Sequence, residues 1–286
     1  MARLNEIYRA SPDLWSRLRA IRGLPTIPRV LLEVQELLLD GSSDSDVLAE
    51  TLSQDQALTA KLLKLVNSAY YGFHRQITSV HQAIVLVGYE EVRGLACAFS
   101  VMDAWGPHGG KAFDRSAFWE HSLATARMTH ALSREISHLP PESDPFVGGL
   151  LHDIGKVVFD HAFPVEFDAA VTMARRDHIP LRDAEIRVFG APHEAVGAWF
   201  LDSWNLPVDL IDGVRWHHDP RETSSSPVLP ALIHVSNVAS HRFGPGHSGN
   251  PMPDDQVDSS LDLLGLSASA IEDAASIFGT RRTPVV

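Results

Sequence analysis

The chain has 286 residues, of which 44% are apolar and 21% charged, and these are ordinary values for a globular protein. Its formal net charge of -12 argues against non-specific binding to nucleic acid or to anionic membranes, although the sum leaves room for a local basic groove. The single cysteine, Cys97, excludes an internal disulfide, and its apolar surroundings favour a buried inert thiol over a nucleophile.

Several protein classes lack support in the sequence. No apolar stretch reaches the roughly 18 residues that a membrane span needs, and the N-terminus lacks the apolar core of a signal peptide. Neither a phosphate loop, a dinucleotide fingerprint, a nucleophile elbow nor a cysteine metal knuckle is present. We therefore expect a cytoplasmic protein that does not bind membranes or nucleic acid.

Apolar residues at helical spacing dominate the first part of the chain. The predicted helices here are residues 30–38, 44–52, 58–66, 79–87 and 91–102. The run Val85–Val87 alone would also suit a strand, but its helical surroundings favour a helix. Polar and aromatic residues cluster at Asn67–Phe73, which indicates either core packing around a capped loop or a recognition surface. We carry the second interpretation forward as a hypothesis, because residues 24–105 contain no convergent set of histidines or carboxylates.

The segment Trp105–Gly110 is the clearest break in the chain, and we place a lobe boundary there. The helices predicted after it are residues 114–137, 145–161, 164–177, 192–204, 207–218 and 229–242, with polar loops at 219–228 and 244–258. The sequence thus predicts an all-α, two-lobed helical bundle. Its parts are a leader helix (residues 1–23), an N-terminal lobe (24–110) and a second helical lobe with a C-terminal extension (111–286).

The most informative polar residues lie in the second lobe. The pair His152-Asp153 directly follows an apolar run, and buried polar groups need partners. Lys156 lies about one helical turn after His152, so both side chains can face one pocket. Four further histidines are candidates to join them: His121, His193, His217 and His218.

Two interpretations of these histidines stay open on the residues alone. Neutral imidazoles and carboxylates that converge from several helices can hold a divalent ion in a bundle core. Alternatively, the histidines are core and helix-end residues with ordinary hydrogen-bond partners. Because adjacent residues on a helix point about 100° apart, we do not expect His217 and His218 to bind one ion together, whereas two neighbouring ions could share them.

Seven segments resemble the HDOD domain family, the signalling relatives of the HD metal-dependent phosphohydrolases. The segments Asn67-Ser68-Ala69 and Trp204-Asn205-Leu206-Pro207 make the resemblance specific. It spans roughly residues 24–220 and is carried by residues 24–28, 55–71, 77–84, 148–156, 193–198, 204–207 and 217–218. The resemblance implies an all-α fold with an HD-like second lobe and a role in bacterial signal transduction.

The related HD-GYP domains hydrolyse cyclic di-GMP at two or three metal ions. Their ligand pattern, carried over onto this chain, implies metal ligands at His121, His152, Asp153, His193, His217 and His218. Two departures count against catalysis. No Gly-Tyr-Pro signature follows His218, and Asn237 stands where an aspartate ligand is expected.

We therefore expect a non-catalytic regulatory protein that binds a signalling protein or a small nucleotide-like ligand, with an oligomeric state left open. The alternative is a metal-dependent phosphodiesterase acting on a nucleotide or cyclic dinucleotide, in which Lys156 and Asp153 take catalytic roles. A weaker third interpretation is a scaffold in which the ion only stabilises the fold. The expected cofactor is a divalent metal (Fe, Mn or Zn) that is bound weakly or not retained.

Overall fold

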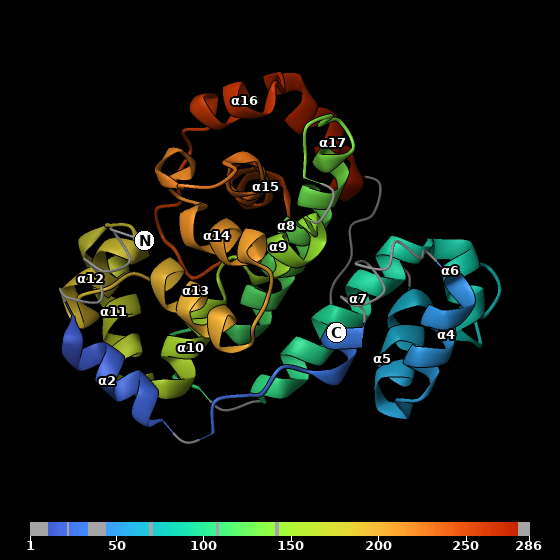
Figure 1. Cartoon of the computed structure of the whole chain (residues 1–286), viewed down its shortest axis with the longest axis horizontal. Helices are drawn as coiled ribbons and strands as arrows, with labels where there is room; N and C mark the ends of the chain where they lie inside the picture. Colours follow the sequence, from blue (N-terminus) through green and yellow to red (C-terminus); the bar gives the residue numbers. More distant parts are fainter. Residues whose placement is uncertain are drawn as a thin grey trace. The chain divides into compact units, whose positions relative to one another are not determined.

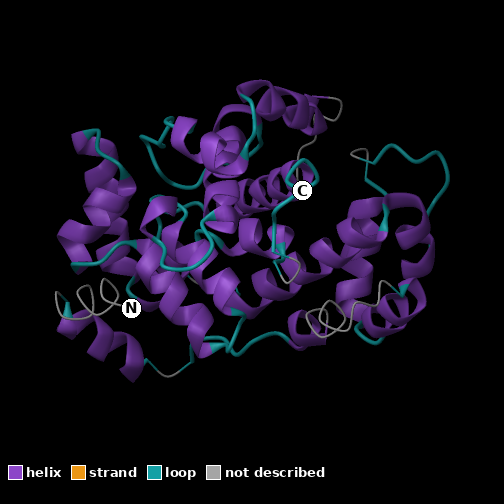
Figure 2. Ribbon diagram, turned by 45° about the horizontal axis from the view of Figure 1, so that its top comes forward, coloured by secondary structure: helices purple, strands orange, loops and turns teal. Residues whose placement is uncertain are grey.

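The structure is a computed structural model that describes residues 11–21, 23–33, 44–68, 71–106, 109–140 and 143–279. Helices are the only regular secondary structure in these ranges, which confirms the predicted all-α class (Figure 2). The contacts divide the chain into two units. The larger unit contains the described residues within 1–24 and 107–276, and the smaller unit contains those within 25–106 together with 277–279. The predicted domain boundaries remain a prediction, because these contacts do not test independent folding.

Within the described part of the smaller unit, residues 29–33 are helical and four further helices pack around an apolar core. They are α4 (Ser45–Ser53), α5 (Gln56–Val66), α6 (Val80–Val87) and α7 (Tyr89–Trp105). Asp44 and Asp55 cap the first two helices by accepting hydrogen bonds from backbone N–H groups of the first turn. Gly88, at φ +106°, permits the sharp change of direction between α6 and α7. Of the predicted helix 30–38, residues 34–38 lie outside the described residues.

The loop after α5 is closed by one side chain. The Asn67 amide donates to the carbonyl oxygens of Leu63 and Ile77, both at 2.8 Å, and its Oδ1 accepts from the Ile77 N–H at 2.7 Å. Tyr71 is buried and its hydroxyl donates to Glu91 at 2.7 Å, while the Phe73 ring stacks on it and stays 37% exposed. Of the polar and aromatic cluster predicted at 67–73, residues 69 and 70 lie outside the described residues, while Asn67 and Tyr71 are tied into the fold of the smaller unit.

The larger unit is a helical bundle whose elements are seen in Figure 1. In chain order they are α2 (Pro12–Ala20), α8 (Arg115–Ser133), α9 (Pro145–Leu151), α10 (Ile154–Ala162), α11 (Pro164–Asp177), α12 (Leu181–Phe189), α13 (His193–Ser203), α14 (Val208–Trp216), η1 (Pro220–Glu222), α15 (Val228–Phe243), α16 (Asp258–Leu264) and α17 (Ala268–Gly279). Of the predicted leader helix, residues 1–10 and 22 lie outside the described residues, and α2 forms the remainder.

Three sequence expectations for this unit are wrong. The single helix predicted at 145–161 is two helices, α9 and α10, interrupted at His152-Asp153. No helix is predicted between residues 177 and 192, where the nine residues of α12 lie between Pro180 and Gly190. Helices α16 and α17 were also missed, because the polar loop before them ends the clear apolar periodicity.

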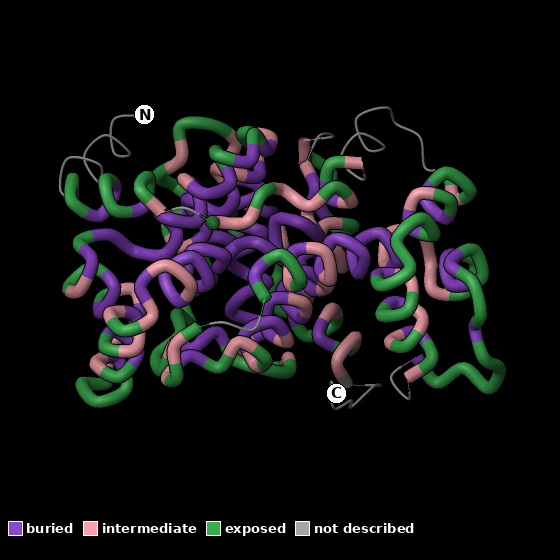
Figure 3. Tube along the Cα trace, turned by 90° about the horizontal axis from the view of Figure 1, so that it is seen from below, coloured by how far each residue is buried: buried purple, intermediate pink, exposed green. Residues whose placement is uncertain are grey.

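The core of the larger unit forms where α8, α9 and α15 pack together. Gly149 permits the contact between α9 and α8, because a Cβ at this position would lie 2.8 Å from the Ala126 Cα. Helix α15 is buried from Val228 to Ser240, and Figure 3 shows the buried stretches of the described chain in purple. Because of this packing, polar side chains of α8 and α15 face the break between α9 and α10.

Candidate metal centre

The centre is built around the break between α9 and α10. His152 caps the C-terminal end of α9, and Asp153 occupies the N-cap position of α10 with φ -103° and ψ 11°. Both side chains are fully buried. The break turns this polar pair away from the helical hydrogen-bond pattern and toward side chains of other elements.

Gly155 brings a second helix to the pair. A Cβ on Gly155 would lie 1.9 Å from the His193 carbonyl oxygen, so only glycine allows the first turn of α10 to contact the first turn of α13 this closely. As a result, the His193 Nε2 lies 2.9 Å from the Asp153 Oδ1. The glycine of the His-Asp segment therefore positions a histidine 40 residues further along the chain.

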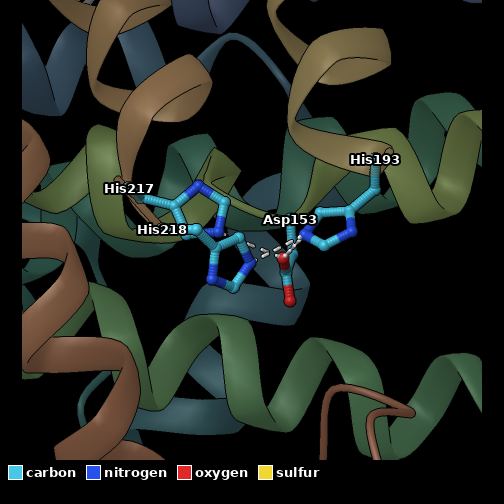
Figure 4. A group of neighbouring side chains, drawn as sticks. All are labelled: Asp153, His193, His217 and His218. Carbon is cyan, nitrogen blue, oxygen red and sulfur yellow. Dashed lines mark hydrogen bonds and ion pairs between the residues drawn. The ribbon is translucent and has the colours of Figure 1, made fainter. Parts of the chain in front are cut away.

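One group of candidate ligands, which we call the first half-site, comprises Asp153, His193, His217 and His218. One ligand atom from each lies within 4.8 Å of all the others. Figure 4 shows the three imidazoles surrounding the Asp153 carboxylate. The His217 Nε2 lies 3.7 Å from the Asp153 Oδ1, and the His193 and His218 Nε2 atoms are 3.2 Å apart.

The expectation that His217 and His218 would diverge is wrong. Helix α14 ends at Trp216, His217 is its C-cap and His218 lies beyond it, so helical geometry no longer separates the two side chains. Their ring centroids are 4.1 Å apart. Both histidines can therefore approach one ion in the first half-site.

A second group, the second half-site, comprises His121, His152 and the shared Asp153, again with ligand atoms within 4.8 Å. His121 comes from α8 and is fully buried. The Asp153 Oδ2 faces this side and lies 3.3 Å from the His152 Nε2. The Lys156 ammonium donates to the same oxygen. The two oxygens of Asp153 thus face two different histidine groups, as a bridging carboxylate would.

Asn237 lies in the second half-site, on α15. Its Oδ1 is 2.9 Å from the His121 Nε2, where an ionised carboxylate was expected from the resemblance. The amide is neutral, so this half-site holds less negative charge than an aspartate would provide.

Several side-chain atoms in the centre are suited to a metal ion. The His152 Nδ1–H donates to the Gly149 carbonyl at 2.8 Å, and the His217 Nδ1–H donates to the Val214 carbonyl at 2.7 Å. These bonds leave the lone pair of each Nε2 facing inward, which is the arrangement of metal-binding histidines. Both Nε2 atoms and the His121 Nδ1 are buried with no hydrogen-bond partner. Orphaned buried acceptors are costly, so the residues present fit a divalent ion.

Burial keeps most of these imidazoles neutral. It holds the pKa of His121, His217 and His218 well below the usual range, and neighbouring histidines add to the shift. Burial by itself would raise the pKa of Asp153, but Lys156 and the adjacent histidines outweigh it and hold that pKa well below its usual range. Neutral imidazoles beside an ionised carboxylate are the protonation states that a metal ion requires.

His193 is the exception. Burial alone would lower its pKa, but the Glu185 and Asp153 carboxylates outweigh that effect and raise the pKa to about 9. The Glu185 Oε2 accepts from both the Nδ1 and the backbone N–H of His193, at 2.6 and 2.8 Å. Glu185 is fully buried on α12 and acts as the partner that orients this imidazole.

Sequence reasoning missed Glu185 because it missed α12. It also missed Glu194, which is buried and pairs with Arg182 at 2.6 Å, and His241, whose ring centroid lies 4.3 Å from that of His121. Burial, reinforced by Lys156, lowers the pKa of His241 to about 4, which keeps this imidazole neutral as well. A signal for His241 was available in the sequence, because it lies four residues after Asn237 on a predicted helix.

Comparison with known proteins places the chain in a family. The HDOD domain matches residues 24–220, and the chain belongs to the HDOD domain family. An HDOD domain protein of Geobacter sulfurreducens, of unknown function, has a similar structure, with 27% identity, a TM-score of 0.76, and coverage of 94% of this chain and 95% of that one.

Further similar structures show the fold. A protein of Shewanella amazonensis named as a candidate phosphohydrolase shares 23% identity with a TM-score of 0.69, covering 94% of this chain and 95% of its own. A candidate signal transduction protein of Marinobacter aquaeolei shares 19% identity with a TM-score of 0.74, covering 96% of this chain and 63% of its own. At these identities the likeness concerns the fold alone.

An uncharacterized protein of Treponema pallidum is 28% identical over 199 residues. The matched region is 70% of this chain but only 38% of that protein, so the chain spans less than half the length of this relative. Within the part of the chain that the structure describes, every helix is too short or too polar to cross a membrane.

Proposed function

We propose that this chain is a regulatory protein of signal transduction that holds a divalent metal in its larger unit and acts by binding a signalling protein or a small nucleotide-like ligand, without substrate turnover. The observation that supports this proposal best is the burial of the centre. His152, Asp153 and His217 are fully buried, and Lys156 is 2% exposed. A phosphodiester would need direct contact with these groups, and removing its charge from water to reach these buried side chains is costly.

Asn237 supports the same conclusion. At an effective dielectric constant of about 20, two unit charges about 4 Å apart interact by about 4 kcal/mol, and a divalent ion would gain more from a carboxylate at this position. The neutral Asn237 has nearly the same shape as an aspartate but lacks its attraction for the ion. The proposed metal is Fe, Mn or Zn, held by His121, His152, Asp153, His193, His217 and His218.

The second candidate function is a metal-dependent phosphodiesterase. The position of Lys156 favours it, since this ammonium contacts the Asp153 carboxylate shared by the two half-sites and would offset phosphate charge. A bound ion would supply Lewis-acid chemistry and an activated water in such a reaction. In that case Asp153 would hold the ion, and Lys156 would move from Asp153 to the phosphate. The name of the Shewanella amazonensis protein agrees with this alternative.

Elemental analysis of the purified protein, together with an assay on bis(p-nitrophenyl) phosphate and a cyclic dinucleotide, separates the two functions. We expect the purified protein to contain metal or to bind added metal. Its phosphodiester turnover should not exceed that of a His217→Gln variant, whose first half-site lacks one ligand. The exposed His247 provides the matched control, His247→Gln. Turnover that the control retains and His217→Gln abolishes would establish the phosphodiesterase and overturn the regulatory proposal.

A further inference from the structure

His241 lies beside the second half-site but has no role in the ligand set above. It belongs to α15, four residues after Asn237, so both side chains lie on one face of that helix. Its imidazole is half-buried, and its ring centroid is 4.3 Å from that of His121 at an angle of 34° between the ring planes. The His241 ring therefore lies against the second half-site, but its nitrogens fall outside the group of ligand atoms that lie within 4.8 Å of one another, so coordination would require the ring to turn toward the ion.

A buried serine holds the His241 ring in place. The His241 Nε2 lies 3.2 Å from the Ser248 Oγ, and Ser248 is 1% exposed. When the Nε2–H donates to this hydroxyl, the lone pair remains on Nδ1. Hydrogen bonding of one ring nitrogen to a fixed partner, with the other left as the electron donor, is the usual arrangement of a metal-binding histidine.

The loop that carries Ser248 is itself seated on α8 one turn before His121. The His247 N–H donates to the Ala117 carbonyl at 3.0 Å. Gly246, at φ +76°, allows this contact, because a Cβ there would lie 2.3 Å from the same oxygen. The chain therefore fixes both the helix and the loop on which the orientation of His241 depends.

The second half-site needs another donor. His121, His152 and Asp153 supply three ligands, and ions such as zinc take four or more. The Asn237 Oδ1 is already engaged with the His121 Nε2. That bond leaves the His121 Nδ1 buried without a partner, next to the His241 ring.

We propose that His241 is a metal ligand of the second half-site, where it supplies the donor that Asn237 does not. The inference rests on the metal-binding part of the proposed function and extends its ligand set. Each half-site then consists of three imidazoles and one oxygen of Asp153. Such donors favour zinc, cobalt, nickel and ferrous iron over manganese and magnesium. The Lys156 ammonium lies on the Asp153 Oδ2 and repels an ion most strongly on this side, so the second half-site is the weaker of the two.

Titration of the metal-free full-length protein with Co²⁺, followed by calorimetry and by the visible absorption of the bound ion, tests this assignment. We expect two binding steps of unequal affinity, with Mn²⁺ filling only the tighter one. In His241→Gln the weaker step should lose at least about tenfold in affinity, while the tighter step and the melting temperature are retained. Loss of an outer hydrogen-bonding partner costs about 10–100-fold in metal affinity, and loss of a direct ligand costs no less.

Two further variants strengthen the test. Ser248→Ala leaves the imidazole present but unrestrained, and it should weaken the second step alone. The exposed His247, on the same loop, provides the matched control, and His247→Gln should leave both steps intact. A second step that is unchanged in His241→Gln would overturn the proposal, as would a single step in the unmodified protein or equal loss of both steps. Phosphodiester turnover, by contrast, would overturn only the regulatory function.

Discussion

The two units of this chain differ in what they bury. Among the described residues of the smaller unit, Arg93 is the single buried charged or strongly polar side chain, and it pairs with Glu90 at 2.8 Å. The larger unit buries a whole set of ionisable groups: His121, Asp144, His152, Asp153, Lys156, Asp160, Glu185, His193, Glu194, Arg215, His217 and His234.

Burial of so many ionisable groups is costly, and apolar residues of the same size would often stabilise the fold as well or better. The cost is concentrated where four helices meet the α9–α10 break, and several of the buried atoms there have no partner. We propose that the larger unit retains these groups for metal binding, whereas the smaller unit is stabilised by an apolar core. The following predictions test this division.

The largest effect is expected when a buried charge in the larger unit loses its partner. Asp153→Asn leaves the Lys156 ammonium buried and unpaired, so the free energy of unfolding of the metal-free protein should fall by about 3–5 kcal/mol. Chemical denaturation measures this change. In the double variant Asp153→Asn/Lys156→Met most of the loss should be recovered, since no charge is then left unpaired. An unaltered stability of Asp153→Asn would show that Lys156 finds another partner.

A smaller effect should follow when the partner of a candidate ligand is removed. Glu185→Ala removes the acceptor that orients the His193 imidazole, and metal affinity should fall by about 10–100-fold. Glu185→Gln keeps an acceptor for the ring N–H and should retain more of the affinity. Calorimetric titration with Zn²⁺ compares the three proteins. If the two variants bind the ion as tightly as the parent, His193 is not oriented by Glu185.

In the smaller unit, substitution of a polar side chain should lower stability without changing metal affinity. Asn67→Ala removes three hydrogen bonds that close one loop, and it should cost about 1 kcal/mol because the group is exposed to water. Metal affinity should not change. Thermal unfolding and metal titration of the same samples provide the test, and a shift in metal affinity would contradict the division between the units.

The smallest effect on stability is expected at Phe73, which is 37% exposed. Phe73→Ala should change the free energy of unfolding by less than about 0.5 kcal/mol. If the smaller unit is a recognition module, the same substitution should weaken partner binding, whereas Tyr71→Ala should mainly lower stability because Tyr71 is buried against Glu91. Unchanged partner binding in Phe73→Ala would leave this segment with a packing role only.

The sequence by itself determined the helical class, since apolar residues recur at helical spacing along most of the chain. It also singled out His152-Asp153 and Lys156, because a polar pair after an apolar run demands partners. Through the family resemblance it supplied His121, His193 and the two consecutive histidines as further candidates. These are local or motif-level features, and each can be recognised without knowledge of the packing.

Only the tertiary structure decided how these residues meet. The helix break at His152-Asp153 and the contact of Gly155 with the His193 carbonyl depend on α10 packing against α13, far apart in sequence. Glu185 and His241 carry no motif, and their proximity to the centre follows from the positions of α12 and α15. A one-dimensional pattern indicates which face of a helix is apolar, but the partner of each face is selected by close packing over the whole unit. For that reason the sequence provided most of the candidate ligands, and the structure provided their orientation, their hydrogen-bond partners and one further histidine.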